Sequence, residues 1–331
     1  MPELRKDPIV GRWVIISTER GKRPSDWAFE ARIRKGGFCP FCPGNEDKTP
    51  PEILAVRDGG PAQANSPGWR VRVVPNKFPA LQIEGELNRR GEGLYDLMNG
   101  IGAHEVIIET PDHEKELADL DVSHIESILK VFRDRVTDLR NDLRFQYILV
   151  FKNHGGTAGA SLEHSHSQLI ATPILPKRVA EELDGANKHY RLKERCIYCD
   201  IIHQEMDSKK RIIQETDAYL AIAPFASRFP YETWILPKEH ASHYERMEEV
   251  FYHKFAEILK DVLQRIQRTL DAPPYNFIIH SSPIQRADVP EYHWHMEIIP
   301  KLSRIAGFEW GSGFYINPIP PEDAAAHLAE G

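Results

Sequence analysis

The sequence has only four cysteines among its 331 residues and no long hydrophobic run. So few cysteines exclude a small fold that depends on several disulfide bonds. Apolar stretches such as Tyr147–Phe151 are far shorter than the roughly 20 residues that a membrane-spanning helix needs. The first residues also lack the apolar core of a signal peptide. We therefore expect a cytoplasmic protein that does not associate with membranes.

An excess of positive charge is absent as well. The 42 Lys and Arg residues stand against 49 Asp and Glu residues, which gives a formal net charge of −7. A net acidic chain disfavours general nucleic-acid binding, although local groups can still hold a small anion. Apolar residues make up 41% of the chain and charged residues 27%, which is typical of a globular protein. The length predicts about two packed domains.

The same series of sequence features occurs twice along the chain. Each half has a C-x-x-C pair, an apolar strand that ends in a histidine, a helix, a β-branched strand and a strand with His-x-His. Apolar residues recur with the same helical spacing in Ile125–Val136 and Phe255–Ile266, so both segments are predicted helices. The order strand, helix, strand, strand predicts an α+β fold, with an antiparallel sheet packed against helices in each repeat. We place the two domains at residues 1–188 and 189–331.

The repeat gives each half one set of candidate metal ligands. In a reducing compartment, a C-x-x-C pair is more often half of a metal site or a redox pair than a structural disulfide. Two cysteines with two histidines are a common ligand set for structural zinc. The alternative is that these residues are core cysteines and solvated histidines. The two sets are Cys39, Cys42, His113 and His164, and Cys196, Cys199, His240 and His293.

A glycine-rich segment precedes the His-x-His strand of the first half. Glycines and small residues let a ligand approach the backbone, and the exposed N–H groups of such a loop suit phosphate oxygens. An ordinary surface loop can have the same composition, so the argument depends on the polar strand that follows. The glycines are Gly155, Gly156 and Gly159.

Three polar side chains alternate along that strand. Residues two apart on a strand point to the same face, so we expect His164, His166 and Gln168 to lie together. Neutral imidazole is a nucleophile and a phosphorylated imidazole is a good leaving group, so His166 can carry a nucleotidyl group between two acceptors. Gln168 can donate an amide N–H to a phosphoryl oxygen. A surface strand with polar side chains is the alternative.

These motifs resemble the galactose-1-phosphate uridylyltransferase family of the histidine-triad superfamily, with its close relative, plant-type ADP-glucose phosphorylase. The resemblance covers nearly the whole chain. It implies two tandem histidine-triad domains, usually in a homodimer, and ping-pong transfer through a covalent nucleotidyl-histidine at His166. The segments that carry it are Arg5–Pro8, Arg12–Ile15, Lys22–Pro24, Cys39–Cys42, Asn76–Phe78, Pro111–His113, Asn153–Gln168 and Pro237–His240.

The resemblance also implies roles for single residues. It places zinc on the first ligand set and, as in the plant-type relative, on the second. Some members bind iron through residues that match Glu182, His280 and His295, but Glu297 stands here where a histidine completes that site, which argues against iron. Ser161 joins His166 and Gln168 as a catalytic residue. The implied nucleotide-binding residues are Arg23, Asn76, Phe78 and Asn153.

The implied activity is nucleotidyl transfer between a nucleotide sugar and a sugar phosphate. We expect transfer of UMP from UDP-glucose to hexose 1-phosphate, a step of galactose metabolism; the alternative is adenylyl transfer, as in ADP-sugar phosphorolysis. Ser165, where well-known uridylyltransferases have proline, and the segment Gly311–Pro318 are plant-type features. A histidine-triad hydrolase is more distant, because hydrolases carry a third histidine in place of Gln168. A non-catalytic nucleotide-binding module would be expected to have lost His166.

Overall fold

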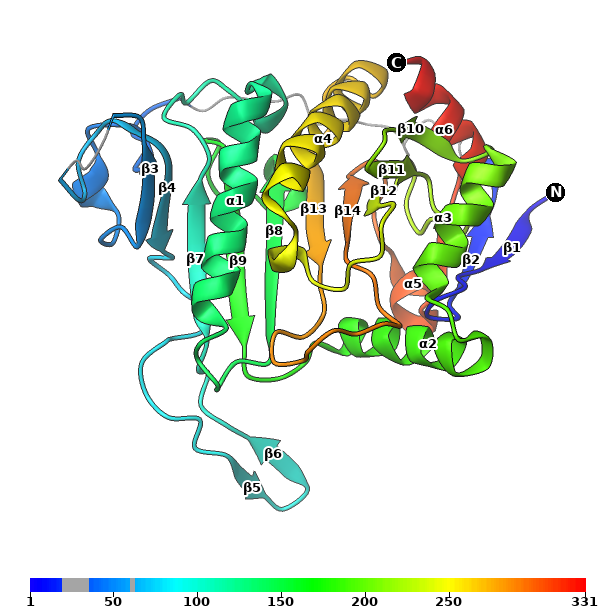
Figure 1. Ribbon diagram of the computed structural model, residues 1–331, viewed down its shortest axis with the longest axis horizontal. Helices are drawn as coiled ribbons and strands as arrows, with labels where there is room; N and C mark the ends of the chain where they lie inside the picture. Colours follow the sequence, from blue (N-terminus) through cyan, green and yellow to red (C-terminus); the bar gives the residue numbers. More distant parts are fainter. Residues whose placement is uncertain (20–35, 60–62) are drawn as a thin grey trace.

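The computed structural model describes residues 1–19, 36–59 and 63–331, and its centre is a single sheet of ten strands (Figure 1). Every neighbouring pair in this sheet is antiparallel. In spatial order the strands are β10 (Ile212–Glu215), β11 (Tyr219–Ile222), β12 (Thr233–Pro237), β14 (His295–Pro300), β13 (Tyr275–His280), β8 (Tyr147–His154), β9 (His166–Thr172), β7 (Ala103–Ile108), β4 (Trp69–Pro75) and β3 (Leu54–Arg57).

The two halves of the chain meet in the middle of this sheet. Strand β8 of the first half pairs with β13 of the second, with Tyr275 opposite His154 and Ile279 opposite Val150. Five strands lie on either side of this junction, so each half contributes an antiparallel sheet, as predicted. Residue 188, the predicted boundary, lies within helix α2 (Lys177–Lys193). The division into two domains stays a prediction.

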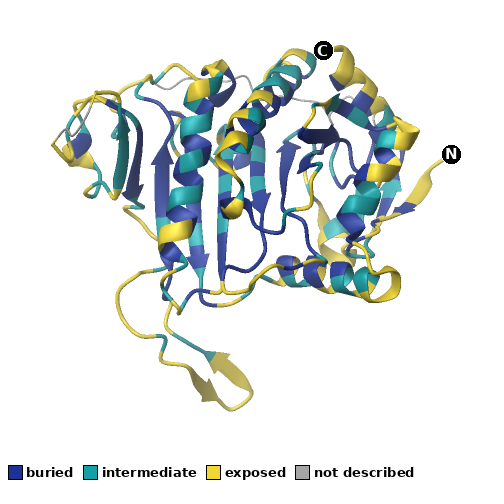
Figure 2. Ribbon diagram, in the orientation of Figure 1, coloured by how far each residue is buried: buried dark blue, intermediate teal, exposed yellow. Residues whose placement is uncertain are grey.

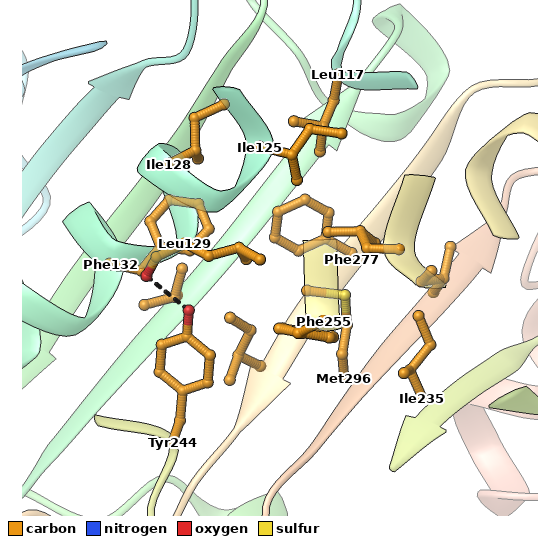
Figure 3. Packing of buried hydrophobic residues seen from close by; sticks show 14 of the residues in the cluster. Leu117, Ile125, Ile128, Leu129, Phe132, Ile235, Tyr244, Phe255, Phe277 and Met296 are labelled. Atoms are coloured by element: carbon orange, nitrogen blue, oxygen red, sulfur yellow. Dashed lines mark hydrogen bonds between the residues drawn. The ribbon is translucent and has the colours of Figure 1, made fainter. Parts of the chain in front are cut away.

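Two long helices cover one face of the sheet. Helices α1 (Val122–Leu139) and α4 (Glu249–Thr269) lie side by side and correspond to the two predicted helices (Figure 1). Their apolar stripes pack on the strands, and Figure 3 shows Phe255 of α4 close to Met296 of β14. The Tyr244 hydroxyl donates a hydrogen bond of 2.7 Å to the carbonyl oxygen of Leu129 in α1. The helical spacing of apolar residues in the sequence is therefore explained by this shared core.

The opposite face of the second half is covered by other segments. Ile9 of the N-terminal segment, Val179 of α2 and Tyr198 of α3 (Ile197–Ser208) belong to one buried apolar cluster with Leu220 of β11. Gly185 of α2 touches the N-terminal segment so closely that a Cβ atom there would lie 1.9 Å from the carbonyl oxygen of Ile9. Only glycine permits this approach.

The remaining elements are short. Figure 2 shows that the hairpin of β5 and β6 is largely exposed, whereas the central strands are buried. None of the helices within the described ranges is both long enough and apolar enough to span a membrane. These elements are β1 (Glu3–Lys6), β2 (Trp13–Ile16), β5 (Arg90–Glu92), β6 (Tyr95–Leu97), α5 (Gly307–Ser312), β15 (Tyr315–Asn317) and α6 (Pro321–Glu330).

Candidate active site and metal centres

The four predicted ligands of the first half converge beside β9. Cys39 Sγ lies 3.6 Å from His164 Nδ1, and Cys42 Sγ lies 3.4 Å from His113 Nδ1 and 3.7 Å from His164 Nδ1. With Zn–S and Zn–N bonds of about 2.3 and 2.05 Å, a tetrahedral ion separates sulfur from nitrogen by about 3.6 Å. The three distances therefore fit one four-coordinate zinc ion.

A hydrogen bond sets which nitrogen of His164 faces the cysteines. His164 Nε2 donates to the carbonyl oxygen of Thr110 at 2.7 Å, so Nδ1 keeps its lone pair for a metal. Burial, together with the neighbouring Cys39, raises the pKa of the Cys42 thiol to about 11. A bound cation would instead stabilise the thiolate, so metal binding here would release a proton.

The second half builds a matching set of ligands. Cys199 Sγ lies 3.4 Å from His240 Nδ1 and 3.6 Å from His293 Nδ1. His293 Nε2 donates to the carbonyl oxygen of Pro237 at 2.9 Å, which mirrors the bond made by the first-half histidine. With Cys196, the four ligand atoms all lie within 4.8 Å of one another. Both sets can hold a metal ion with the geometry that zinc prefers.

A third group brings together Glu182, His280 and His295, the residues for which the family resemblance implied a possible iron site. Glu182 accepts hydrogen bonds from His280 Nδ1 at 3.1 Å and from the Tyr292 hydroxyl at 2.9 Å, and His295 lies within the same group. Glu297, in the position of the missing fourth ligand, forms a buried ion pair with Arg228. Because an arginine already engages this carboxylate, the residues do not fit a four-ligand iron site.

His166 occupies the first position of β9 and is 6% exposed. Its Nδ1 donates to the carbonyl oxygen of His164 at 2.8 Å, so Nε2 carries the lone pair. Burial, followed by the nearby charge of Lys152, lowers the pKa of the His166 imidazole to about 4. The ring is therefore neutral near pH 7, as a nucleophile must be.

Gln168 lies on the same face of β9 as His166, as predicted, but His164 does not belong to the strand. His164 precedes β9, and its ring is directed at the cysteines instead. Gln168 Oε1 lies 2.9 Å from Nε2 of His104, which stands on β7 opposite Ile170. The sequence analysis missed this contact, because it depends on the register between β7 and β9.

Two of the three predicted glycines are required by the backbone. Gly155 has φ +84°, and a Cβ atom there would lie 2.8 Å from Pro274. Gly159 has φ +93°, in the left-handed region that favours glycine. Gly156 has neither a positive φ nor a close neighbour. The loop therefore needs glycine at its two ends rather than throughout.

The glycine loop is supported from the second half of the chain. Asn276 on β13 donates from Nδ2 to Asn153 Oδ1 at 2.7 Å and to the carbonyl oxygen of Ala158 at 2.9 Å. Next to it, the Tyr275 and His154 rings stack with centroids 4.7 Å apart. Asn153 is thus oriented by a residue more than one hundred positions away, which no local motif indicates.

The other predicted site residues lie in the segments that follow β4 and the glycine loop, or outside the described ranges. Asn76 and Phe78 follow β4, and Phe78 is 84% exposed. Ser161 is exposed in the connection between the glycine loop and His164. Arg23 lies outside the described residues. Of the predicted site residues that the structure describes, His166 is buried and Gln168 half-buried, whereas Phe78 and Ser161 are exposed.

Comparisons with known proteins identify the family of this chain. A family model described as the N-terminal domain of galactose-1-phosphate uridyl transferase matches residues 1–176, more than half of the chain. The chain belongs to the galactose-1-phosphate uridylyltransferase family. A second model, a domain of unknown function named DUF4921, matches residues 101–330.

Two curated proteins are similar to this chain over all or nearly all of its length. ADP-glucose phosphorylase of Arabidopsis thaliana is 39% identical over 99% of this chain and 93% of its own. Galactose-1-phosphate uridylyltransferase of Thermotoga maritima is 32% identical over 100% of this chain and 98% of its own length. The solved Arabidopsis enzyme with bound ADP-glucose matches with a TM-score of 0.87, covering 100% of this chain and 99% of that one. These relatives support a nucleotidyltransferase with the histidine-triad-like α+β fold.

Proposed function

We propose that the protein transfers a nucleotidyl group through a covalent intermediate on His166. The hydrogen bond from His166 Nδ1 to the backbone carries this proposal, since it leaves the Nε2 lone pair for attack. Nε2 attacks the α-phosphorus of a nucleotide sugar, an N–P bond forms, and the P–O bond to the sugar phosphate breaks with its electron pair on the leaving oxygen. A second phosphate-bearing acceptor then takes the nucleotidyl group from nitrogen.

In this proposal Gln168 and the glycine loop surround the phosphoryl group. The amide of Gln168 donates to a phosphoryl oxygen, where negative charge develops during transfer. The loop between Gly155 and Gly159 offers backbone N–H groups to the phosphates. Ser161 and Asn153 lie beside the loop and bind the same part of the nucleotide, while Phe78 presents an exposed ring to the base.

Zinc in both cysteine–histidine sets is part of the proposal. When bound, zinc supplies a structural crosslink between distant segments rather than chemistry on the substrate. His164 connects this crosslink to the nucleophile, because its side chain faces the cysteines while its carbonyl oxygen orients His166.

ADP-glucose is our first choice of donor, with phosphate as the acceptor. The support is the 39% identity to a protein named ADP-glucose phosphorylase, against 32% to the Thermotoga uridylyltransferase. Ser165, a plant-type feature, also favours ADP-glucose over UDP-glucose. Its hydroxyl donates a hydrogen bond of 2.7 Å to buried Glu109, a bond that proline could not make. Transfer of UMP from UDP-glucose to hexose 1-phosphate is the second candidate, supported by the Thermotoga relative's full-length match.

Intact-protein mass spectrometry tests the mechanism and the donor together. Incubation with ADP-glucose alone should add one adenylyl group per chain and release one equivalent of glucose 1-phosphate. Phosphate should then discharge the adduct as ADP. His166→Gly should abolish the adduct and keep the bound zinc.

The other outcomes are equally informative. Labelling by UDP-glucose alone would establish the uridylyl candidate and keep the mechanism. Continuous release of nucleotide without an acceptor would indicate a hydrolase. Turnover without any adduct would mean that the acceptor attacks the nucleotide sugar directly, and the proposed role of His166 would be wrong.

A further inference from the structure

We propose that His104 is a positioning residue that fixes the orientation of the Gln168 amide and links it to the loop carrying Asn76 and Phe78. The proposal rests on the proposed function, in which Gln168 donates to a phosphoryl oxygen. His104 itself touches no reacting atom in this scheme.

The ring nitrogen of His104 that carries the hydrogen determines how this side chain binds Gln168. The backbone N–H of Ala80 donates to His104 Nδ1 at 3.1 Å. A backbone N–H cannot accept a hydrogen bond, so Nδ1 must hold the lone pair and Nε2 must carry the hydrogen. His104 Nε2 lies 2.9 Å from Gln168 Oε1, and it therefore donates to that oxygen.

This bond leaves only one useful orientation for the Gln168 amide. With Oε1 engaged by His104, the NH₂ group points away from the histidine and is presented as a donor. The flipped amide would set NH₂ against the N–H of His104, donor against donor, and would lose a hydrogen bond. An N–H donor that is already oriented stabilises the negative charge that develops on the phosphoryl group better than a donor that must first rotate.

His104 also holds the loop that follows β4. Its carbonyl oxygen accepts from the Asn76 backbone N–H at 2.8 Å, and its Nδ1 accepts from the Ala80 backbone N–H at 3.1 Å. The Asn76 Nδ2 atom lies 3.1 Å from His104 Nε2, but both atoms carry hydrogen, so this contact is not a hydrogen bond. The Asn76 Oδ1 atom in turn accepts from the Phe78 backbone N–H at 2.9 Å. One half-buried imidazole thus contacts both the phosphoryl side and the base side of the proposed site.

A double-mutant cycle separates this role from a merely structural one. His104→Phe keeps a flat ring without the hydrogen bonds and should slow adduct formation from ADP-glucose or UDP-glucose, whichever labels the protein, about tenfold to a hundredfold. His104→Gln, whose amide can still donate to Gln168, should recover part of the rate. In a Gln168→Ala background, His104→Phe should cause little further slowing, because both changes remove the same donor.

Matched controls keep the test decisive. His253→Phe replaces a half-exposed histidine of α4, on the opposite side of the sheet, and should leave the rate unchanged. Equal slowing by His104→Phe with and without Gln168, or a wild-type rate in His104→Phe, would overturn the proposal. Failure of the wild-type protein to form an adduct would instead overturn the proposed function.

Discussion

At the residue scale, the proposed function makes Gln168 the residue that distinguishes a transferase from a hydrolase. An amide can hold a phosphoryl oxygen, but it cannot relay a proton to water or to a leaving group. We expect Gln168→His to slow transfer about tenfold or more and to introduce slow hydrolysis of the adduct, because imidazole can relay that proton. Nucleotide released without an acceptor measures the hydrolysis. Gln168→Ala is the control, and it should lose rate without gaining hydrolysis. Unchanged transfer in Gln168→His would show that this side chain does not contact the phosphoryl group.

At the element scale, a buried ion pair between Lys152 and Glu109 anchors strand β9. Lys152 Nζ donates to Glu109 Oε2 at 2.6 Å, to Ser165 Oγ at 3.0 Å and to the carbonyl oxygen of His166 at 3.0 Å. Both charged side chains are at most 1% exposed. His166, the proposed nucleophile, is therefore positioned both by the hydrogen bond of its ring Nδ1 and by the hydrogen bond to its own carbonyl oxygen.

Removing one member of this pair should be costly. Lys152→Met leaves the Glu109 carboxylate buried without its cation, and we expect a loss of about 3–5 kcal/mol in the free energy of unfolding, measured by urea denaturation. The double variant Lys152→Met, Glu109→Gln removes both charges and keeps an acceptor for the serines, so it should recover much of this loss. If the double variant is as unstable as the single one, the ion pair is not what stabilises the strand.

At the scale of the whole molecule, two cysteine–histidine sets that can each hold a metal ion bring together distant segments of the chain. We expect metal analysis of the purified protein to approach two zinc ions per chain. Cys39→Ser and Cys196→Ser should each remove one ion and lower the melting temperature, since structural zinc contributes directly to folding free energy. Only Cys39→Ser should also remove most of the nucleotidyl transfer, because its centre contains His164, whose carbonyl orients His166.

The same measurement has clear opposing outcomes. An active, metal-free protein with an unchanged melting temperature would contradict both centres. One ion per chain, lost in Cys39→Ser and kept in Cys196→Ser, would contradict the second centre alone.

The sequence by itself determined the features that depend on neighbouring residues. The helices over Ile125–Val136 and Phe255–Ile266 followed from apolar spacing, because a helix that buries one face must repeat its apolar residues with the helical period. Both cysteine–histidine sets followed from residue type and repetition, since few side chains can bind zinc. The homodimer and the cytoplasmic location stay predictions.

Only the tertiary structure decided contacts that depend on strand register. The junction of β8 with β13, the support of Asn153 by Asn276, and the bond from His104 to Gln168 all join residues far apart in the chain. Alternation along a strand indicates which side chains share a face, but it does not indicate which strand lies alongside. That choice is made by long-range packing of the whole sheet, and the orientation of the Gln168 amide depends on it.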